Sequence, residues 1–311
     1  MRVIHGLRQI KKFKKPVVAL GVFDGVHRGH SKILRAAVKQ AHRIKGTSLV
    51  VTFWPHPQKE ESLYALEHRL KLLSDLGLDV CLVINFNPRF ARISADNFVK
   101  NFLVQKIGTH YLYVGKNFRF GRQAEGNIYT LKKLAKKHSI HLKIFKVIKV
   151  KNKPISSTYI RTLVKKGELS RVRTLLNRPV SILGIVIKGS FFARKLGFPT
   201  ANINPHHEVI PPSGVYAVRI FLAGKKFKGV CYIGTNPTLE LKRPLHVEVH
   251  IFNFHQNIYG KNLELQFLQK IRKEKRFSSS NPLIEQINKD ITFAKNLFSR
   301  HSDTPQYMPA H

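Results

Sequence analysis

The chain has 311 residues, of which 43% are hydrophobic and 10% aromatic, so it is long enough for two folded domains and too apolar for wholesale disorder. Its 55 lysines and arginines outnumber 17 acidic residues, and the resulting net charge of +38 is scattered along the chain rather than gathered in a basic tail. Two cysteines argue against a disulfide scaffold, and the absence of an apolar run of about 18 residues predicts no membrane span, so we expect a cytoplasmic protein.

The first half of the chain alternates between short apolar runs and segments with apolar residues at helical spacing. This alternation predicts a parallel sheet with helices on both faces, in which ligands bind at the carboxyl ends of the strands. In chain order the predicted elements are a strand over 17–22, a helix over 31–45, a strand over 48–53, a helix over 63–76, a strand over 78–86, a helix capped by Ser94, a strand over 111–115, a helix over 128–137 and a strand over 140–150.

The pattern changes near Pro179, where strand-like segments follow one another without helices. They cover residues 181–187, 215–222, 227–233, 246–254 and 263–267, and the connection 223–226 has the composition of a hairpin. A single amphipathic stripe over 282–298 then predicts a closing helix. We expect an antiparallel barrel here, with domains over 1–178 and 179–300 and a disordered tail over 301–311.

The run Gly21–His30 (GVFDGVHRGH) follows the first predicted strand directly. His27 and His30 are three residues apart, so they face the same way on an opening helical turn. The start of a helix adds N–H donors and positive dipole, and glycines let the backbone approach a phosphate closely. Transfer of a nucleotidyl group needs donors aimed at the phosphate in this manner. A bare H-x-x-H would be weak evidence among 16 histidines, but the complete string favours a nucleotide site.

Two further segments of the first half carry candidate ligand groups. The run Ile155–Arg161 (ISSTYIR) combines hydroxyls, a helix start and an arginine, which makes a second phosphate cradle or, with equal weight, an ordinary helix cap with a surface arginine. Asn117 and Phe118 lie in an aromatic loop flanked by glycines, which either contacts a ligand or packs against the protein itself.

The second half holds a different set of oxygen donors. Thr200 and Asn202 in Pro199–Asn202 (PTAN) point to one side if the segment is extended, and such hard donors suit Mg²⁺ held mainly by ATP phosphates. A simple proline turn is the alternative. Glu248 is a lone acid in an alternating basic strand, where it accepts a proton from an attacking hydroxyl or forms a structural ion pair.

These motifs, together with Thr52–Pro57 (TFWPHP) and Val114–Gly121 (VGKNFRFG), occur in the order found in one family, and the match covers the chain except its tail. The chain resembles the prokaryotic bifunctional riboflavin kinases/FMN adenylyltransferases, or FAD synthetases. The resemblance implies an α/β fold: a Rossmann-like nucleotidyltransferase domain with a parallel sheet, then an antiparallel Greek-key-like β-barrel with a C-terminal helix. It also implies phosphorylation of riboflavin to FMN and adenylylation of FMN to FAD, with ATP and Mg²⁺ required and FMN and FAD as product ligands.

The resemblance assigns roles to individual residues. It implies catalytic roles for His27, His30 and Glu248 and, in the kinase, ATP and Mg²⁺ binding by Thr200 and Asn202, with Thr200 reaching the metal through ATP. For the adenylyltransferase it implies ATP contacts from Gly21, Phe23, Asp24, His27, His30, Ser157 and Arg161, and flavin or nucleotide contacts from Asn117 and Phe118.

Some residues depart from the family pattern. Ala193 stands where a glycine-rich loop is common, and its methyl group would disfavour a positive φ. Trp54 and Asn117 stand where Asp is frequent. An active adenylyltransferase joined to a weak or inactive kinase is therefore an alternative. A nucleic-acid-binding protein built on an enzyme scaffold is a third interpretation, motivated by the +38 charge. We expect ATP, riboflavin and FMN as ligands, and neither a nucleic acid nor a membrane as partner.

Overall fold

The computed structural model describes residues 1–7, 10, 12–57, 61–189, 192–205, 208–234 and 246–300. Its contacts divide the chain into two compact units. Among the described residues the first, here the sheet unit, lies within 1–62 and 66–157, and the second, the barrel unit, contains residues 63–65 together with those from Thr158 to Arg300. The segment Leu63–Ala65 therefore folds with the barrel unit although the chain on both sides of it belongs to the sheet unit.

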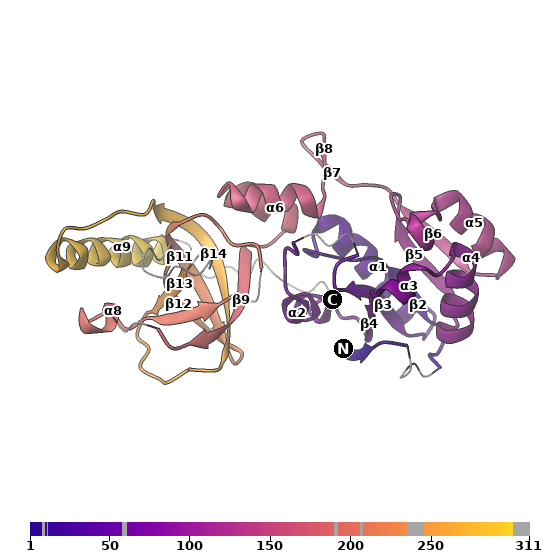
Figure 1. The fold of residues 1–311 in the computed structure, drawn as a ribbon, viewed down its shortest axis with the longest axis horizontal. Helices are drawn as coiled ribbons and strands as arrows, with labels where there is room; N and C mark the ends of the chain where they lie inside the picture. Colours follow the sequence, from indigo (N-terminus) through magenta and orange to yellow (C-terminus); the bar gives the residue numbers. More distant parts are fainter. Residues whose placement is uncertain are drawn as a thin grey trace. The chain divides into compact units, whose positions relative to one another are not determined.

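The described part of the sheet unit is built on a six-stranded sheet in the order β1-β4-β3-β2-β5-β6 (Figure 1). Every pairing in this sheet is parallel. From β2 the chain moves through β3 to β4 on one side and then returns to β5 on the other, so the topological switch lies where β2 and β5 end. The strands are β1 (Arg2–His5), β2 (Val17–Leu20), β3 (Ser48–Trp54), β4 (Val80–Asn85), β5 (Tyr111–Gly115) and β6 (His141–Phe145).

Helices cover both faces of this sheet. The helix α1 contacts β2, β3 and β5, and its own buried residues include Leu34 and Ala37. Buried residues of η1 and α5, such as Phe102 and Leu131, pack instead in a cluster with Val18 and its neighbours on the opposite face. The helical segments are α1 (Arg28–Arg43), α2 (Leu66–Ser74), α3 (Pro88–Ala91), α4 (Ala95–Asn97), the wide π-type helix η1 (Phe98–Ile107), the short η2 (Arg122–Ala124) and α5 (Ile128–Lys137).

The predicted alternation of strands and helices is confirmed, with three differences. The edge strand β1 was not expected, because Ile4 is its one buried residue and the segment is too polar to stand out. The strand predicted over 140–150 ends at Phe145, and a small hairpin of β7 (Lys149–Val150) and β8 (Lys153–Pro154) follows it. Ser94 does cap the next helix, its hydroxyl accepting the N–H of Asn97, but the helix widens to π-type from Phe98.

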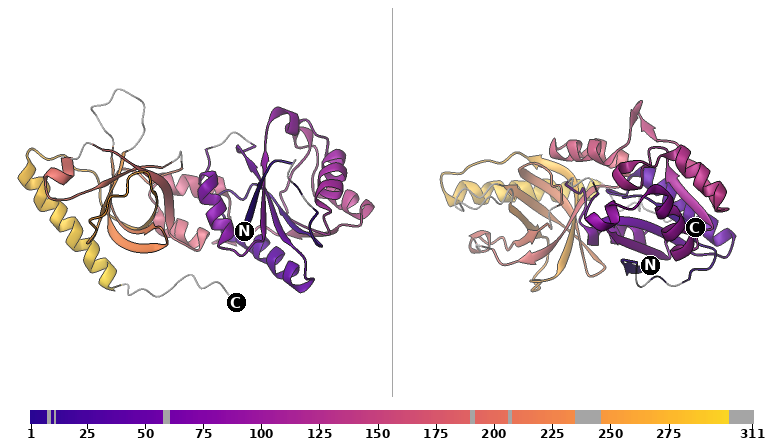
Figure 2. Two further views of the ribbon diagram at one scale, coloured as in Figure 1. Left: turned by 90° about the horizontal axis from the view of Figure 1, so that it is seen from below. Right: turned by 45° about the vertical axis from the view of Figure 1, so that its right-hand side comes forward.

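The barrel unit contains six described strands that close in the order β10-β13-β12-β11-β14-β9, shown as a ring in Figure 2. All of its pairings are antiparallel, and β10-β13-β12-β11 has the spatial order of a Greek key. The strands are β9 (Val180–Ile187), β10 (Ala201–Asn204), β11 (Gly214–Leu222), β12 (Lys225–Gly234), β13 (His246–Ile251) and β14 (Asn262–Arg272). The expected antiparallel barrel is confirmed.

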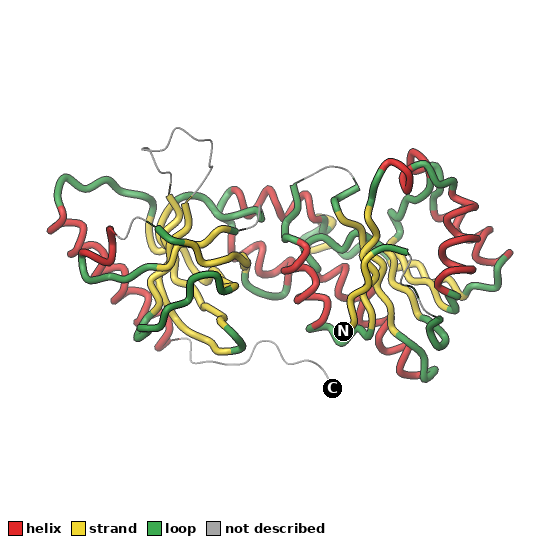
Figure 3. Tube along the Cα trace, turned by 60° about the horizontal axis from the view of Figure 1, so that its bottom comes forward, coloured by secondary structure: helices red, strands yellow, loops and turns green. Residues whose placement is uncertain are grey.

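The predicted hairpin joins β11 to β12 through Ala223 and Gly224, both at positive φ, as a two-residue turn requires. The closing helix α9 (Ser280–Arg300) buries Ala294 and Phe298 against Ala217 of the barrel. Figure 3 shows it as a long helix beside the strands. The unit also holds α7 (Leu169–Leu176), α8 (Phe192–Lys195) and all of α6 (Ser157–Lys165) after its first residue. The tail 301–311 lies outside the described residues.

Candidate active sites

The loop Gly21–His30 leaves the end of β2 and leads into α1 at the topological switch of the sheet unit. His27 caps the helix: its backbone is extended, and its Nδ1 accepts the N–H of His30 at 3.3 Å. The two imidazole rings stack with centroids 3.6 Å apart. Both rings therefore lie at the N-terminus of a 16-residue helix, where backbone N–H groups and the dipole attract an anion.

The same loop holds side chains in unusual backbone conformations. Phe23 and Val26 have φ of 52° and 40°, values that a bulky or β-branched residue rarely adopts. Gly29 is closely packed in the same loop, because a Cβ there would lie 3.1 Å from Cε1 of His27. Such conformations persist only when surrounding groups hold them. The loop must therefore be fixed by contacts from outside it.

A buried arginine supplies such contacts. Arg69, on α2, is fully buried, and its Nη1 donates to the carbonyl of Val22 at 3.2 Å. Its Nη2 lies 3.5 Å from the carboxylate of Asp24, which is 1% exposed. Burial lowers the pKa of the Arg69 guanidinium, and the Asp24 carboxylate opposes that shift. Sequence reasoning missed Arg69, although a charged residue three positions from Leu66 on the apolar stripe was a usable signal.

The second predicted phosphate motif meets the first. The Ser157 hydroxyl donates to the backbone carbonyl of Asp24 at 2.6 Å. Arg161 lies one turn along the same helix and is buried, with its Nη2 donating to the Thr158 hydroxyl at 3.0 Å. The structure thus joins Gly21, Phe23, Asp24, His27, His30 and Ser157 in one loop cluster, and Arg161 follows Ser157 on helix α6.

The predicted flavin or nucleotide loop begins at the end of β5, directly across the switch from β2. Asn117 is exposed, whereas Phe118 is partly buried and stacks on Phe120 with centroids 5.6 Å apart. Phe118 also packs against the main hydrophobic cluster of the sheet unit. The aromatic residues therefore contribute to packing, and Asn117 is an exposed polar residue that follows the end of β5, the strand next to β2.

In the barrel unit the other set of predicted residues converges. The Thr200 hydroxyl donates to Oε2 of Glu248 at 3.3 Å, and Asn202 is the register partner of Glu248 across β10 and β13. Residues directly opposite on paired strands project from the same face. The extended segment assumed for Thr200 and Asn202 is present, since β10 begins at Ala201. Sequence analysis did not expect this strand, because it is only 4 residues long and follows a proline.

Asn202 sits in a narrow cradle. It is 5% exposed, and its Oδ1 has no hydrogen-bond partner among the residues that the structure describes. A Cβ on Gly189 would lie 1.8 Å from Nδ2 of Asn202, so only glycine fits against this amide. A buried oxygen without a donor, beside a hydroxyl and a carboxylate, is suited to a hard cation. The described residues hold no cluster of three or more His, Cys, Asp or Glu, so such an ion would depend largely on substrate phosphates.

Three neighbours of Glu248 were not anticipated. His246 lies on the same face of β13, with Nε2 at 2.5 Å from Oε1 of Glu248. Tyr232 is opposite Glu248 across β12 and β13, and its hydroxyl donates to Glu274. Burial and the bond to Glu274 raise the pKa of Tyr232 well above its ordinary value. Strand alternation was the available signal for His246, but nothing in the sequence pairs Tyr232 with Glu274.

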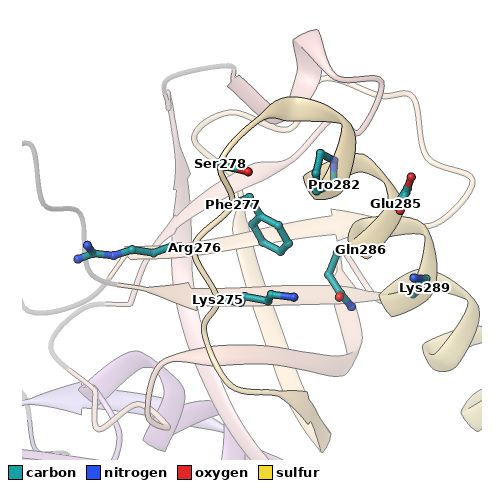
Figure 4. A pocket seen from close by; sticks show the side chains of 8 residues that line it. All are labelled: Lys275, Arg276, Phe277, Ser278, Pro282, Glu285, Gln286 and Lys289. Carbon is teal, nitrogen blue, oxygen red and sulfur yellow. The ribbon is translucent and has the colours of Figure 1, made fainter.

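A cavity of about 270 Å³ opens beside Glu274, between the loop after β14 and helix α9. Its lining consists of Lys275, Arg276, Phe277, Ser278, Pro282, Glu285, Gln286 and Lys289. Figure 4 shows the Phe277 ring between the loop and the helix. Arg272 and Lys275 hold cationic groups 5.8 and 5.6 Å from the centre of that ring. The cavity therefore offers one aromatic face, three cationic side chains and one carboxylate, that of Glu285.

The glycine-poor loop before Pro199 carries less strain than its sequence suggests. Ala193 lies inside helix α8, where the backbone is right-handed, so its methyl group meets no positive φ. Ser190 and Phe191 lie outside the described residues, as do Thr235 to Thr238 of another family motif. The steric argument against the kinase based on Ala193 is therefore wrong.

Comparisons with known proteins match both halves of the chain. A family model described as FAD synthetase matches residues 9–159, and one described as riboflavin kinase matches residues 176–298. The bifunctional riboflavin kinase/FMN adenylyltransferase of Buchnera aphidicola subsp. Schizaphis graminum is 38% identical, covering 96% of this chain and 99% of that relative. The protein of the same name from Bacillus subtilis is 36% identical, covering 96% and 98%.

A solved structure also resembles this fold along nearly its whole length. It is a Streptococcus pneumoniae protein described as a macrolide-efflux protein, with a TM-score of 0.84 and 26% identity, covering 95% of this chain and 99% of that one. Within the described residues, no helix of the present structure has the length and apolar character needed to cross a membrane.

Proposed function

This chain belongs to the family of bifunctional riboflavin kinases/FMN adenylyltransferases, and from that premise we propose how its residues divide the two reactions. The chain phosphorylates riboflavin to FMN and adenylylates FMN to FAD. We assign adenylylation to residues 1–178 and phosphorylation to residues 179–300. The separate matches to 9–159 and 176–298 support this division.

In the adenylyltransferase, a phosphate oxygen of FMN attacks the α-phosphorus of ATP, and pyrophosphate leaves with the electrons of the broken P–O bond. Negative charge grows on the α-phosphate as the bond breaks, so donors fixed in advance lower the barrier. His27 and His30 would supply them together with the N-terminus of α1. Gly21, Phe23 and Asp24 shape the loop around the phosphates, and Ser157 and Arg161 would hold the outer phosphates. The stacking of His27 on His30 at the helix start supports this assignment.

The aromatic loop completes the proposed adenylyltransferase site. Asn117 would hydrogen-bond nucleotide or flavin from the strand end beside β2, because the carboxyl ends of β2 and β5 are adjacent. Phe118 would back that contact with an apolar surface while it packs on Phe120.

In the kinase, the 5′-hydroxyl of riboflavin attacks the γ-phosphorus of ATP, and ADP leaves. Glu248 would take the hydroxyl proton as the new P–O bond forms. Thr200 and Asn202 would hold Mg²⁺ together with the ATP phosphates, and the bound ion would neutralise charge on those phosphates. The observation that carries this proposal is the meeting of Thr200, Asn202 and Glu248 on one face of the barrel, with the Asn202 oxygen buried and without a donor among the described residues.

We place riboflavin in the cavity beside Glu274. The choice of this cavity is supported by Glu274, which directly precedes Lys275 of the lining and accepts the hydroxyl of Tyr232, the register partner of Glu248. The Phe277 ring offers an apolar face to a flavin, and the surrounding cations suit a product that carries a phosphate. Phe277→Ala should raise KM for riboflavin and leave FAD formation from added FMN unchanged. An unaltered KM for riboflavin would contradict the placement of riboflavin in this cavity.

The remaining expectations concern the setting of the protein. We propose that it works in the cytoplasm, which the two buried free thiols of Cys81 and Cys231 support. We also propose that its substrates are its principal anionic ligands, without a nucleic-acid partner. Retention on RNA or DNA at physiological salt, with a steep dependence on salt, would contradict this.

The decisive assay follows riboflavin, FMN and FAD by chromatography while the purified chain acts on riboflavin with ATP and Mg²⁺. We expect FMN to rise first and FAD to follow. FAD from added FMN without any product from riboflavin would mean that the kinase is inactive. No product from either substrate would overturn the proposed function as a whole.

A further inference from the structure

Arg69 is the side chain that ties the H-x-G-H loop to the rest of the sheet unit. Its guanidinium is fully buried and bridges three segments. Its Nη2 forms an ion pair with the Asp24 carboxylate, and its Nη1 donates to the Val22 carbonyl and, at 3.4 Å each, to the hydroxyl of Thr52 and the carbonyl of Phe53. Thr52 itself donates to the same Val22 carbonyl at 2.7 Å. One group thus connects helix α2, the end of β3 and the loop after β2.

The contacts of Arg69 fall on the segment of the loop that precedes His27 and His30. Val22 and Asp24 flank Phe23, the residue whose backbone has a positive φ, and His27 lies three residues beyond Asp24. The Asp24 carbonyl is also the acceptor for Ser157. The segment that Arg69 grips therefore sets where both phosphate motifs lie.

Stabilisation of the fold alone does not explain a buried arginine at position 69. Its Nε and Nη2 atoms are buried and make no hydrogen bond among the described residues, so the charge is incompletely satisfied. A buried charge costs stability unless it is paired and fully hydrogen-bonded, and a well-packed apolar side chain often does as well or better. A charge kept in this place is explained by the geometry that it imposes on the loop.

We propose that Arg69 is a positioning residue of the adenylyltransferase: acting through Val22 and Asp24, it holds the Gly21–His30 loop in the conformation that aims His27 and His30 at the nucleotide. The inference rests on the proposed function of that loop. Arg69 is buried beneath the loop, so its effect is on where the donors lie, not on contact with substrate.

The test uses the full chain with Arg69→Gln and Arg69→Lys, and Lys71→Gln as a control on the exposed face of the same helix. We expect kcat for FAD formation from FMN to fall on the order of 100-fold in Arg69→Gln, because displacement of catalytic groups by about 1 Å has that effect. KM for ATP should change much less. Arg69→Lys keeps the charge with fewer donors, so it should recover part of kcat. Lys71→Gln should match the unmodified chain.

Kinase turnover on riboflavin, measured in the same samples, separates positioning from general unfolding. The proposal requires that it stay unchanged while FAD formation falls. A second readout is the fluorescence of Trp54, the one tryptophan of the chain, whose ring lies 5.5 Å from the Arg69 guanidinium carbon. The Trp54 emission maximum of folded Arg69→Gln should differ from that of the unmodified chain. The shift of this maximum on addition of ATP should also differ between the two proteins.

Two results would overturn the proposal. One is FAD formation in a folded Arg69→Gln variant within about threefold of the unmodified chain. The other is an equal loss of both activities in a folded variant. If Arg69→Gln does not fold, Arg69→Lys becomes the test of the proposal. An unchanged kcat for FAD formation in Arg69→Lys would exclude a dependence on the guanidinium geometry. Failure of the proposed function gives a different result, since the unmodified chain would then make no FAD.

Discussion

The hydroxyl of Ser157 donates to the backbone carbonyl of Asp24 at 2.6 Å, across 133 residues of sequence. This bond joins the start of helix α6 to the H-x-G-H loop. It brings together two motifs that are distant in the chain, both of which we propose to bind ATP. It also means that a change in either segment alters the other, so the two motifs form a single unit for mutational analysis.

His30→Ala should abolish most FAD formation and leave FMN formation from riboflavin intact. The imidazole lies at the N-terminus of α1, stacked on His27, where a donor to a charged phosphate is worth about 10²–10³-fold in kcat. Chromatography of both products in one sample measures this. His110→Ala, an exposed histidine of the same unit, serves as the control. Parallel loss of both products would show that the sites are not separate.

Glu248→Gln should have the reverse effect. Its carboxylate accepts the Thr200 hydroxyl and lies opposite Asn202, and loss of a positioned base lowers kcat by about 10²–10⁴-fold. FAD formation from added FMN should be unaffected. The matched control is Glu168→Gln, which makes the same chemical change at a surface ion pair with Arg171. Unaltered kinase turnover in Glu248→Gln would exclude Glu248 as the base.

Gly189→Ala should damage the kinase by displacing Asn202. The added methyl group would lie 1.8 Å from the Asn202 amide nitrogen, so the amide must move by more than 1 Å, and kcat/KM for Mg·ATP should fall on the order of 100-fold. Gly224→Ala, at the tip of the β11–β12 hairpin, meets no atom within 4 Å but is strained by its φ of +79°, so it controls for the cost of replacing a glycine without a steric clash. Equal behaviour of the two variants would contradict the cradle described for Asn202.

Glu208→Ala should destabilise the barrel unit by about 3 kcal/mol, because bonds to a charged acceptor contribute about 1.5–3 kcal/mol each. The buried carboxylate accepts the N–H groups of Ala65 and Leu183 at 2.9 and 3.0 Å. Urea unfolding followed by circular dichroism measures the loss, with Glu168→Ala, at a partly exposed glutamate of the same unit, as the control. A loss no larger than that of the control would show that water replaces the carboxylate without cost.

Alkaline pH should weaken the sheet unit through Cys81. Burial raises the pKa of this thiol from 9.0 to about 12, so the folded state keeps a proton that the unfolded chain releases. Its contribution to stability is complete below pH 9 and is lost as pH rises from there toward 12, by about 1.4 kcal/mol per pH unit. Urea midpoints at pH 8 to 11 should fall less steeply in Cys81→Ala; an identical slope would contradict the prediction.

The features that depend on a local pattern of apolar residues could be predicted from the sequence. The strand after residue 17 and the helix carrying Ile33, Leu34 and Ala37 have clear periodicities, and both are present. The loop between them was placed at the carboxyl edge of the sheet because a parallel sheet puts it there. The H-x-G-H site could therefore be located without any knowledge of the other strands.

The features that depend on pairing could not be predicted. Alternation shows which residues of β13 share a face, but the register that sets Glu248 opposite Asn202 depends on the whole barrel. The partners of Arg69 could not be predicted from the sequence, since Asp24 is 45 residues away and the ion pair between them forms only in the folded sheet unit. The roles given to Arg161, Asn117 and Thr200 remain predictions.

The membership of Leu63–Ala65 in the barrel unit limits how the protein can be dissected. A single scission near residue 157 would leave Leu63 and Tyr64, each 1% exposed in the intact chain, on the fragment to which they do not belong. The excised kinase fragment would lose the backbone N–H of Ala65 that donates to Glu208. The excised adenylyltransferase fragment would expose the side chains of Leu63 and Tyr64 to solvent. Independent expression of either half therefore calls for a repaired surface at residues 63–65 as well as a new terminus.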